Sequence, residues 1–211
     1  HAALLGRFNA DNLLAALATL LAMDTPLEQA CRALDQAAPP PGRMQTLGGK
    51  RAPLIVVDYA HTPDALTKVL ATLREVANES MADGRVLCVF GCGGNRDKGK
   101  RPLMGRAACE GADHIYITSD NPRHEEPEDI IDDILEGIDA ASASRVEVEP
   151  DRARAIYRAI GAARTADIVL IAGKGHEDYQ EVGAQRLHFS DAEMAQRALA
   201  ETARRETGGQ A

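Results

Sequence analysis

Charged and glycine-rich residues follow four apolar runs of the sequence, and their types indicate a site for a small charged ligand. The four polar stretches begin at Asp58, Gly91, Asp120 and Gly173, each close behind a run rich in β-branched residues. Such runs are typical of buried strands in a parallel sheet, whose ligands bind beyond the carboxyl ends of the strands. Four polar termini at one sheet edge therefore predict one shared site.

The stretch after the second run is rich in glycine and basic residues. Residues 94–100, GNRDKGK, approach the pattern of a phosphate-binding P-loop. However, Arg101 stands where that motif needs a hydroxyl to hold Mg²⁺, and Pro102 follows at once, so we exclude a P-loop. Two interpretations stay open: a tight turn that needs glycine, or a cationic loop that faces an anionic ligand. The cations of that loop are Arg96, Lys98, Lys100 and Arg101.

The stretch Asp120-Asn121-Pro122-Arg123 also has two interpretations. Asn-Pro is common in turns, so the segment is either a connection without a ligand or part of a site. In the second case the guanidinium of Arg123 would grip a carboxylate with two hydrogen bonds, while Asp120 and Asn121 would receive an ammonium group. That combination suits the zwitterionic head of an amino acid.

Three further residues at the strand ends have both a functional and a structural interpretation. Asp58 has the position of an acceptor for a ribose hydroxyl, and His61 either precedes a helix without a ligand or belongs to the site. Glu177 is either a solvated loop carboxylate or a second acceptor for an ammonium group. The His176-Glu177 pair lacks the HExxH spacing of a zinc site, so we expect no metal site here.

Alternating strands and helices are needed to position these residues. The predicted strands are 53–60, 85–90, 114–118, 145–149 and 167–173, and the predicted helices are 63–78, 101–111, 127–140, 151–163 and one after Ser190-Asp191. Residues 44–49 and 181–189 predict edge or hairpin strands. The expected fold is α/β: a Rossmann-like, mostly parallel sheet with helices on both faces.

Two helices are predicted before this pattern begins. Residues 8–22 form a strongly apolar segment that Asn9 or Asp11 would cap, and a second helix runs from Thr25-Pro26 to about Ala37. The run Pro39-Pro40-Pro41-Gly42 cannot continue a helix. We therefore predict a boundary that separates residues 1–41 from residues 42–211.

Composition excludes several classes of protein. The chain has 211 residues, 45% of them hydrophobic and 27% charged, which is not the balance of a disordered protein. A net charge of −8 and 3% aromatic residues argue against nucleic-acid binding. No apolar run approaches the roughly 20 residues of a membrane span, and the first residues lack the pattern of a signal peptide. Four cysteines without a CxxC pair are expected to be reduced thiols of a cytoplasmic protein.

Six motifs, taken together and in this order, closely resemble those of the Mur ligase family. They are FNADN (8–12), GRM (42–44), VDYAHTPDAL (57–66), GCGGNRDKGKRPLM (91–104), DNPR (120–123) and AGKGHEDYQ (172–180). The resemblance covers essentially the whole chain. It is to the branch of the family that adds meso-diaminopimelate, because DNPR is the family's recognition motif for that amino acid and lysine-adding relatives usually lack the arginine.

The resemblance implies an ATP- and Mg²⁺-dependent amide-bond ligase of cytoplasmic peptidoglycan precursor synthesis, and so a role in cell shape and division. Its substrates would be UDP-MurNAc-L-Ala-D-Glu and meso-diaminopimelate, joined through an acyl phosphate. The implied diaminopimelate contacts are Arg96, Asp120, Asn121, Pro122, Arg123, Gly173 and Glu177. The implied ATP contacts are Asn12 on the adenine side, Arg43 on the phosphate side, Asp58 at the ribose and His61 in the same motif.

Parts of the family's pattern have no counterpart in these residues. They are the UDP-binding domain, the GTxGKT-type phosphate loop, and the metal-binding carboxylate, histidine and carbamylated lysine. Residues 1–41 are thus expected to be the end of the central ATP-binding domain, and residues 42–211 the amino-acid-binding carboxyl-terminal domain. We expect a monomer that does not catalyse ligation alone, and we assign no catalytic residue to it. The alternatives are a stand-alone module for a small zwitterion, or another Mur-type ligase such as folylpolyglutamate synthase.

Overall fold

A six-stranded sheet forms the centre of the computed structural model, which describes residues 4–80 and 83–208. The strand order is β1-β2-β6-β3-β4-β5, with β1 antiparallel to β2 and the other five strands parallel. The strands are β1 (Gln45–Gly48), β2 (Leu54–Asp58), β3 (Val86–Phe90), β4 (His114–Ile117), β5 (Val146–Val148) and β6 (Ile168–Ala172). Because β2, β3, β4 and β6 run the same way, their polar termini reach one edge of the sheet.

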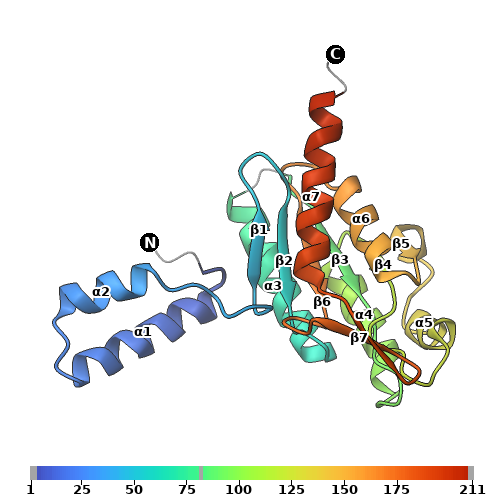
Figure 1. Ribbon diagram of the computed structural model, residues 1–211, viewed down its shortest axis with the longest axis horizontal. Coiled ribbons are helices and arrows are strands. Elements are labelled where there is room, and N and C mark those ends of the chain that lie inside the picture. Colours follow the sequence, from blue (N-terminus) through green and yellow to red (C-terminus); the bar gives the residue numbers. More distant parts are fainter. Residues whose placement is uncertain (1–3, 81–82, 209–211) are drawn as a thin grey trace.

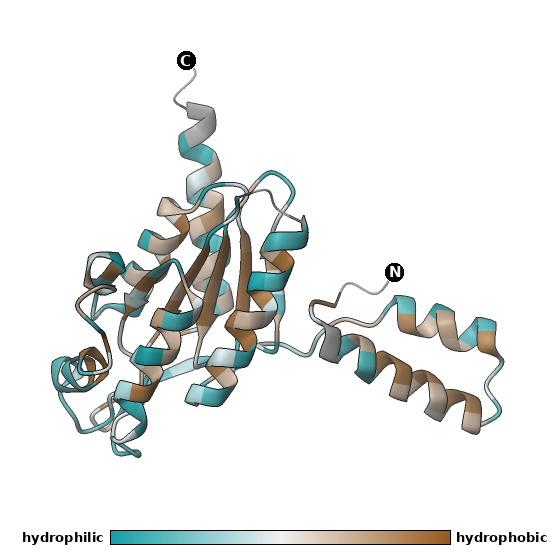
Figure 2. Ribbon diagram, turned by 180° about the vertical axis from the view of Figure 1, so that it is seen from behind, coloured by the Kyte–Doolittle hydropathy of each residue, from teal (hydrophilic) through white to brown (hydrophobic). Residues whose placement is uncertain are grey.

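Helices cover both faces of the sheet (Figures 1 and 2). Val56 of β2 packs into a core with α3 (Pro63–Ser80), α4 (Lys100–Gly111) and α5 (Pro127–Leu135). Its neighbours Ile55 and Val57 point the other way, into a core with α6 (Arg152–Ala162) and α7 (Asp191–Gly208), as the two-residue period of a strand requires. A short 3₁₀ helix, η1 (Ala143–Arg145), precedes β5. The predicted α/β fold with helices on both faces is confirmed.

A separate hairpin stands beside the main sheet. Its strands are β7 (Tyr179–Val182) and β8 (Gln185–His188), which pair antiparallel. A parallel bridge between Arg123 and Val182 joins the hairpin to the loop after β4. The predicted edge strand at 44–49 is present as β1, and the predicted hairpin region at 181–189 is present as β7 and β8.

The first two helices, α1 (Arg7–Ala22) and α2 (Leu27–Asp35), form a hairpin that projects away from the α/β body (Figure 1). Large apolar side chains on this hairpin are exposed, among them Leu14, Met23 and Leu27. The predicted capping is wrong: the N-cap of α1 is Gly6, so Asn9 lies inside the helix and donates from Nδ2 to the Leu5 carbonyl at 2.7 Å.

Helix α5 is shorter than predicted, because it ends at Leu135 rather than at residue 140. The chain turns away at Gly137, where a Cβ atom would lie 1.8 Å from the Pro102 carbonyl oxygen of α4. The close approach of α4 thus limits α5, and nothing in the hydrophobic pattern of residues 127–140 reveals it.

Candidate functional site

The loops after β2, β3, β4 and β6 surround a cavity of about 360 Å³ at the carboxyl edge of the sheet. We call it the strand-end cavity. It is lined by six of the seven residues predicted to contact an amino acid, namely Arg96, Asp120, Asn121, Arg123, Gly173 and Glu177, and also by His61. The seventh, Pro122, is buried behind Gly94, where a Cβ atom would lie 1.9 Å from the Pro122 carbonyl oxygen.

A hydrogen-bonded network connects the acidic side of the cavity. The Asn121 side chain donates from Nδ2 to Glu177 Oε2 at 3.0 Å, and its Oδ1 accepts from Glu181 N at 3.0 Å and from Lys174 Nζ at 3.0 Å. Gln180 Nε2 donates to the Asp120 carbonyl at 2.7 Å. Asn121 thus connects two loops through both ends of its side-chain amide, while it also lines the strand-end cavity.

Lys174 belongs to the motif AGKGHEDYQ, but its sequence does not indicate the role of its side chain. The side chain is fully buried, and Nζ lies 3.3 Å from Asp120 Oδ1. The only indication in the sequence is its position between two glycines, just after an apolar strand. That indication gives no partners, because Asp120 is 54 residues away in the chain.

Arg123 is held firmly by its surroundings, with its backbone at φ 54°. Nη1 donates to the Gly94 carbonyl at 2.9 Å, and Nε lies 2.8 Å from Glu181 Oε2. The guanidinium thus has a defined orientation at the wall of the strand-end cavity, with donors left over because it carries five N–H groups.

The glycine-rich loop divides its cations between the cavity and the protein interior. Arg96 and Lys100 line the strand-end cavity, and Lys100 Nζ donates to the His61 carbonyl at 2.9 Å. Arg101 has no exposed side-chain surface and forms two hydrogen bonds of 3.0 Å to Glu125. These bonds, with a backbone N–H, lower the pKa of Glu125 to about 2. The cationic-loop interpretation is therefore wrong for Arg101.

Lys98 also differs from the interpretation of a cationic loop that faces a ligand. Its Nζ lies 3.1 Å from Glu125 Oε2, so the second cation of the loop pairs with the same internal carboxylate as Arg101. Two of the four basic residues thus stabilise the loop itself, which leaves Arg96 and Lys100 to face a ligand.

Three of the four residues predicted to contact ATP lie at one corner, beside β2. Asp58 accepts hydrogen bonds from Met44 N at 2.8 Å and Ala60 N at 2.9 Å, and burial raises its pKa despite these donors. The Arg43 guanidinium lies 5.5 Å from the centre of the Tyr59 ring, which also contacts His61 with 4.6 Å between ring centres. This corner therefore combines a cation, two aromatic rings and a carboxylate, which are groups that can interact with phosphates, a base and a ribose hydroxyl respectively.

The fourth of these residues, Asn12, is not at this corner. It lies on α1, in the helical hairpin that projects from the body, and is exposed (Figure 1). Its Nδ2 donates to Asn9 Oδ1 at 3.4 Å, within the same helix.

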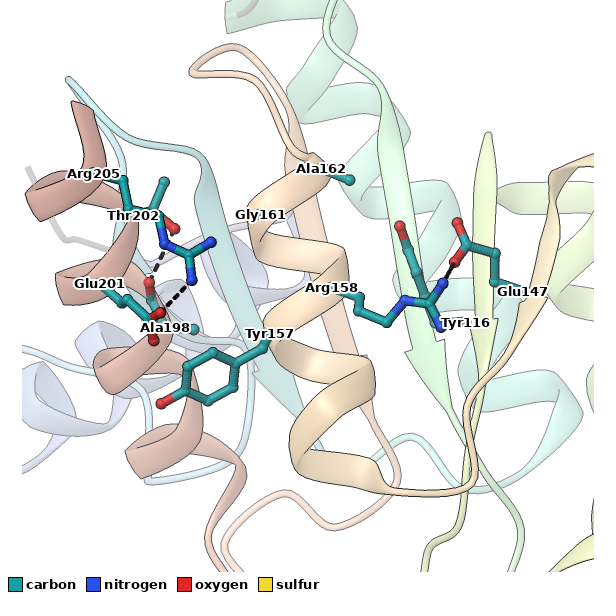
Figure 3. Close-up of a pocket in the computed structure, with 10 residues that line it drawn as sticks. All are labelled: Tyr116, Glu147, Tyr157, Arg158, Gly161, Ala162, Ala198, Glu201, Thr202 and Arg205. Atoms are coloured by element: carbon teal, nitrogen blue, oxygen red, sulfur yellow. Dashed lines mark hydrogen bonds and ion pairs between the residues drawn. The ribbon is translucent and has the colours of Figure 1, made fainter. Parts of the chain in front are cut away.

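A second cavity, of about 500 Å³, lies between α6 and α7 and away from the strand-end loops (Figure 3). Its charged groups are already matched, since Arg158 lies 2.8 Å from Glu147 and Arg205 pairs with Glu201. Across residues 4–80 and 83–208, no group of three or more His, Cys, Asp or Glu side chains is placed to hold a metal ion. In the same residues, no helix has the length and apolar character needed to cross a membrane.

A sequence profile described as "Mur ligase, glutamate ligase domain" matches residues 42–175. The chain belongs to the Mur ligase family. This Mur ligase chain is 54% identical, over 93% of its length, to the UDP-N-acetylmuramoyl-L-alanyl-D-glutamate–2,6-diaminopimelate ligase of Chromobacterium violaceum. It spans 38% of that curated relative.

Solved structures of two longer proteins contain a similar fold. A structure of UDP-N-acetylmuramoyl-L-alanyl-D-glutamate–2,6-diaminopimelate ligase has a TM-score of 0.75 and 43% identity, over 96% of this Mur ligase chain and 40% of that one. Folylpolyglutamate synthase of Mycobacterium tuberculosis, solved with ADP and AMPPCP, has a TM-score of 0.58 and 18% identity, over 99% of this chain and 42% of that one. The second likeness extends to the fold alone.

Proposed function

We propose that this chain is the amino-acid-recognition part of an ATP-dependent ligase that joins meso-diaminopimelate to UDP-MurNAc-L-Ala-D-Glu. The observation that carries the proposal is the meeting of Arg123 with Asp120 and Glu177 in the strand-end cavity. One cation and two carboxylates match the carboxylate and ammonium of an amino-acid head. The names of the similar ligases give the acceptor and the added amino acid.

Meso-diaminopimelate has two amino-acid heads, and the cavity suits the one that does not react. Its carboxylate would pair with Arg123, supported by Arg96, and its ammonium would meet Asp120 and Glu177. The second amine then faces out of the cavity as the nucleophile. Lysine lacks the distal carboxylate, so it would leave Arg123 without an anionic partner and bind less tightly.

Positioning is the main contribution of these residues to catalysis. When bound, ATP would supply its γ-phosphoryl group to the D-Glu carboxylate of the acceptor, with ADP as the leaving group, to give an acyl phosphate. The held amine, in its neutral form, would attack the acyl carbon, so that the C–O bond to phosphate breaks and inorganic phosphate and the amine proton leave. Fixing the amine close to that carbon lowers the entropic part of the barrier. Arg43, Asp58 and His61 would hold the nucleotide at the β2 corner.

The metal ligands that the family resemblance implies have no counterpart in this sequence, so we propose no metal ligand within this chain. We propose that residues 1–41, which contain the α1–α2 hairpin, are the end of a central ATP-binding domain, because the exposed Leu14 and Met23 of the hairpin are suited to packing against further protein. We propose that the complete enzyme is a cytoplasmic monomer and that this chain alone does not turn over ATP.

The proposal is tested by isothermal titration calorimetry of the chain with meso-diaminopimelate, L-lysine and L-glutamate. We expect diaminopimelate to bind at least tenfold more tightly than lysine. Preference for glutamate would favour the folylpolyglutamate synthase alternative. A second assay measures ATP-dependent phosphate release in a complete ligase, made by joining this chain to the upstream part of the Chromobacterium violaceum relative. Binding of the amino acid without ligation there would favour the stand-alone binding module.

A further inference from the structure

Lys174 is a fully buried lysine at the end of β6. A buried ammonium group is unfavourable unless charges and hydrogen bonds compensate it. Nζ lies 3.0 Å from Asn121 Oδ1, 3.3 Å from Asp120 Oδ1 and 3.7 Å from Glu177 Oε2. All three partners line the strand-end cavity, so the buried charge acts on the cavity wall from behind.

The contacts of Lys174 close a ring. Asn121 accepts from Lys174 through Oδ1 and donates through Nδ2 to Glu177 Oε2, the same carboxylate oxygen that Lys174 faces. Because an ammonium group can only donate hydrogen bonds, the amide atom of Asn121 that faces Lys174 must be the oxygen. A change at Lys174 would therefore release Glu177 in two ways, directly and through the Asn121 amide.

A second buried cation provides a contrast. Arg152 is also fully buried beneath these loops and donates to the Ala172 carbonyl at 2.9 Å. Its charge is matched by Asp191, with two contacts of 2.8 Å. For Lys174, the carboxylates within 4 Å in the described part of the chain are Asp120 and Glu177, both at the cavity. Arg152 thus pairs directly with Asp191 and acts on Asp120 and Glu177 only through longer-range attraction, whereas Lys174 contacts both of these carboxylates.

We infer that Lys174 is a positioning residue that holds Asp120 and Glu177 together as paired acceptors for the ammonium of the bound amino acid. Without the ammonium of Lys174, the two converging carboxylates would repel each other and separate. Because Lys174 has no exposed surface, it does not touch the ligand itself. The inference rests on the proposed function and adds the device that shapes its amino-acid site.

The test uses the complete ligase described above, with Lys174→Met, which keeps the length of the side chain and removes its charge. We expect KM for meso-diaminopimelate to rise at least tenfold, while KM for ATP changes less than twofold and kcat less than threefold. The control is Lys68→Met, since Lys68 is an exposed lysine of α3 paired with Asp64. It is expected to change none of these constants.

A double-mutant cycle separates positioning from general structural damage. If Lys174 acts through Glu177, Lys174→Met should add less than threefold to the KM of a Glu177→Gln enzyme. Multiplicative effects in the cycle, or an unchanged KM for diaminopimelate in Lys174→Met, would overturn the inference. Should Lys174→Met lack the near-ultraviolet circular dichroism of the parent, the same constants are read from Lys174→Gln, which keeps hydrogen-bond donors without charge. If the parent enzyme itself does not use diaminopimelate, the proposed function is wrong, and this inference, which rests on it, is wrong as well.

Discussion

Arg123 and Glu181 form an ion pair beside the strand-end cavity, with the Arg123 Nε atom 2.8 Å from Glu181 Oε2. The backbone repeats the connection, because Arg123 N donates to the Glu181 carbonyl at 2.9 Å. The β7–β8 hairpin thus supports a residue whose φ of 54° is unusual for a side chain of this size. The orientation of the arginine is thus set by Glu181, more than fifty positions further along the chain, together with the Gly94 carbonyl on the other side.

Replacement of Arg123 by alanine should weaken binding of meso-diaminopimelate. Loss of a charge-assisted, two-bond contact costs about 1.5–3 kcal/mol, or roughly 10- to 150-fold in affinity. Lysine binding should change little, since lysine has no distal carboxylate. Titration calorimetry of both ligands measures this, with Arg197→Ala on the exposed face of α7 as the control. Equal losses for both ligands would contradict the role given to Arg123.

Replacement of Glu181 by glutamine should have a smaller effect in the same direction. The amide oxygen still accepts from Arg123 Nε, and only the partly exposed ion pair is lost, which is worth about 0.2–1 kcal/mol. We expect diaminopimelate affinity to fall about two- to fivefold, less than for Arg123→Ala. A Glu181→Gln loss as large as that of Arg123→Ala would mean that Glu181 itself contacts the ligand.

Acid should destabilise the protein through Asp167. Burial alone would raise the pKa of Asp167, but hydrogen bonds from the Arg85 side chain and from backbone N–H groups outweigh it and lower the pKa from 3.8 to about 2. A folded-state pKa below the unfolded value stabilises the fold above about pH 4, and this stabilisation is lost as pH falls to 2. In urea titrations, Asp167→Asn should be less stable than the parent at pH 7. That difference should shrink by about 2 kcal/mol by pH 2. A constant difference would exclude this assignment.

Gly42 should tolerate no side chain. Its φ is 67°, and a Cβ atom would lie 2.0 Å from the Gly175 carbonyl carbon and the His176 nitrogen. Gly42→Ala should lower the free energy of unfolding by at least about 2 kcal/mol, from backbone strain and overpacking together. Gly161→Ala is the matched control, because Gly161 lies in α6 with open space around it. This substitution should raise the free energy of unfolding by about 0.5–1 kcal/mol. Denaturation midpoints of both variants measure the contrast.

The strands and the site edge were predictable because their signals are local. The run Leu54–Asp58 is continuous and apolar, as a strand buried on both faces must be, and its polar end then fixes where the site lies. The roles of Arg101 and Lys174 were not predictable. Whether a cation faces a ligand or the interior depends on carboxylates distant in sequence, and Glu125 is 24 residues from Arg101.

Close contacts between backbone segments could not be predicted from the sequence either. Gly42 meets Gly175 across 133 positions of chain, and Gly137 meets Pro102 between two helices. The sequence shows where each glycine is, but it does not distinguish a glycine that permits a turn from one that makes room for a backbone segment distant in the chain. Only the folded arrangement distinguishes them.

The place of β6 in the sheet has a consequence for how the protein folds. Strands β2 and β3 are consecutive in sequence but do not pair, because β6 lies between them and pairs with both. During synthesis, an emerging chain therefore carries two unsatisfied strand edges until residues near 172 leave the ribosome. Such edges invite pairing with other chains. Nascent chains that end before Ile168 should be aggregation-prone, and the whole amino-acid site should assemble in one late, cooperative step.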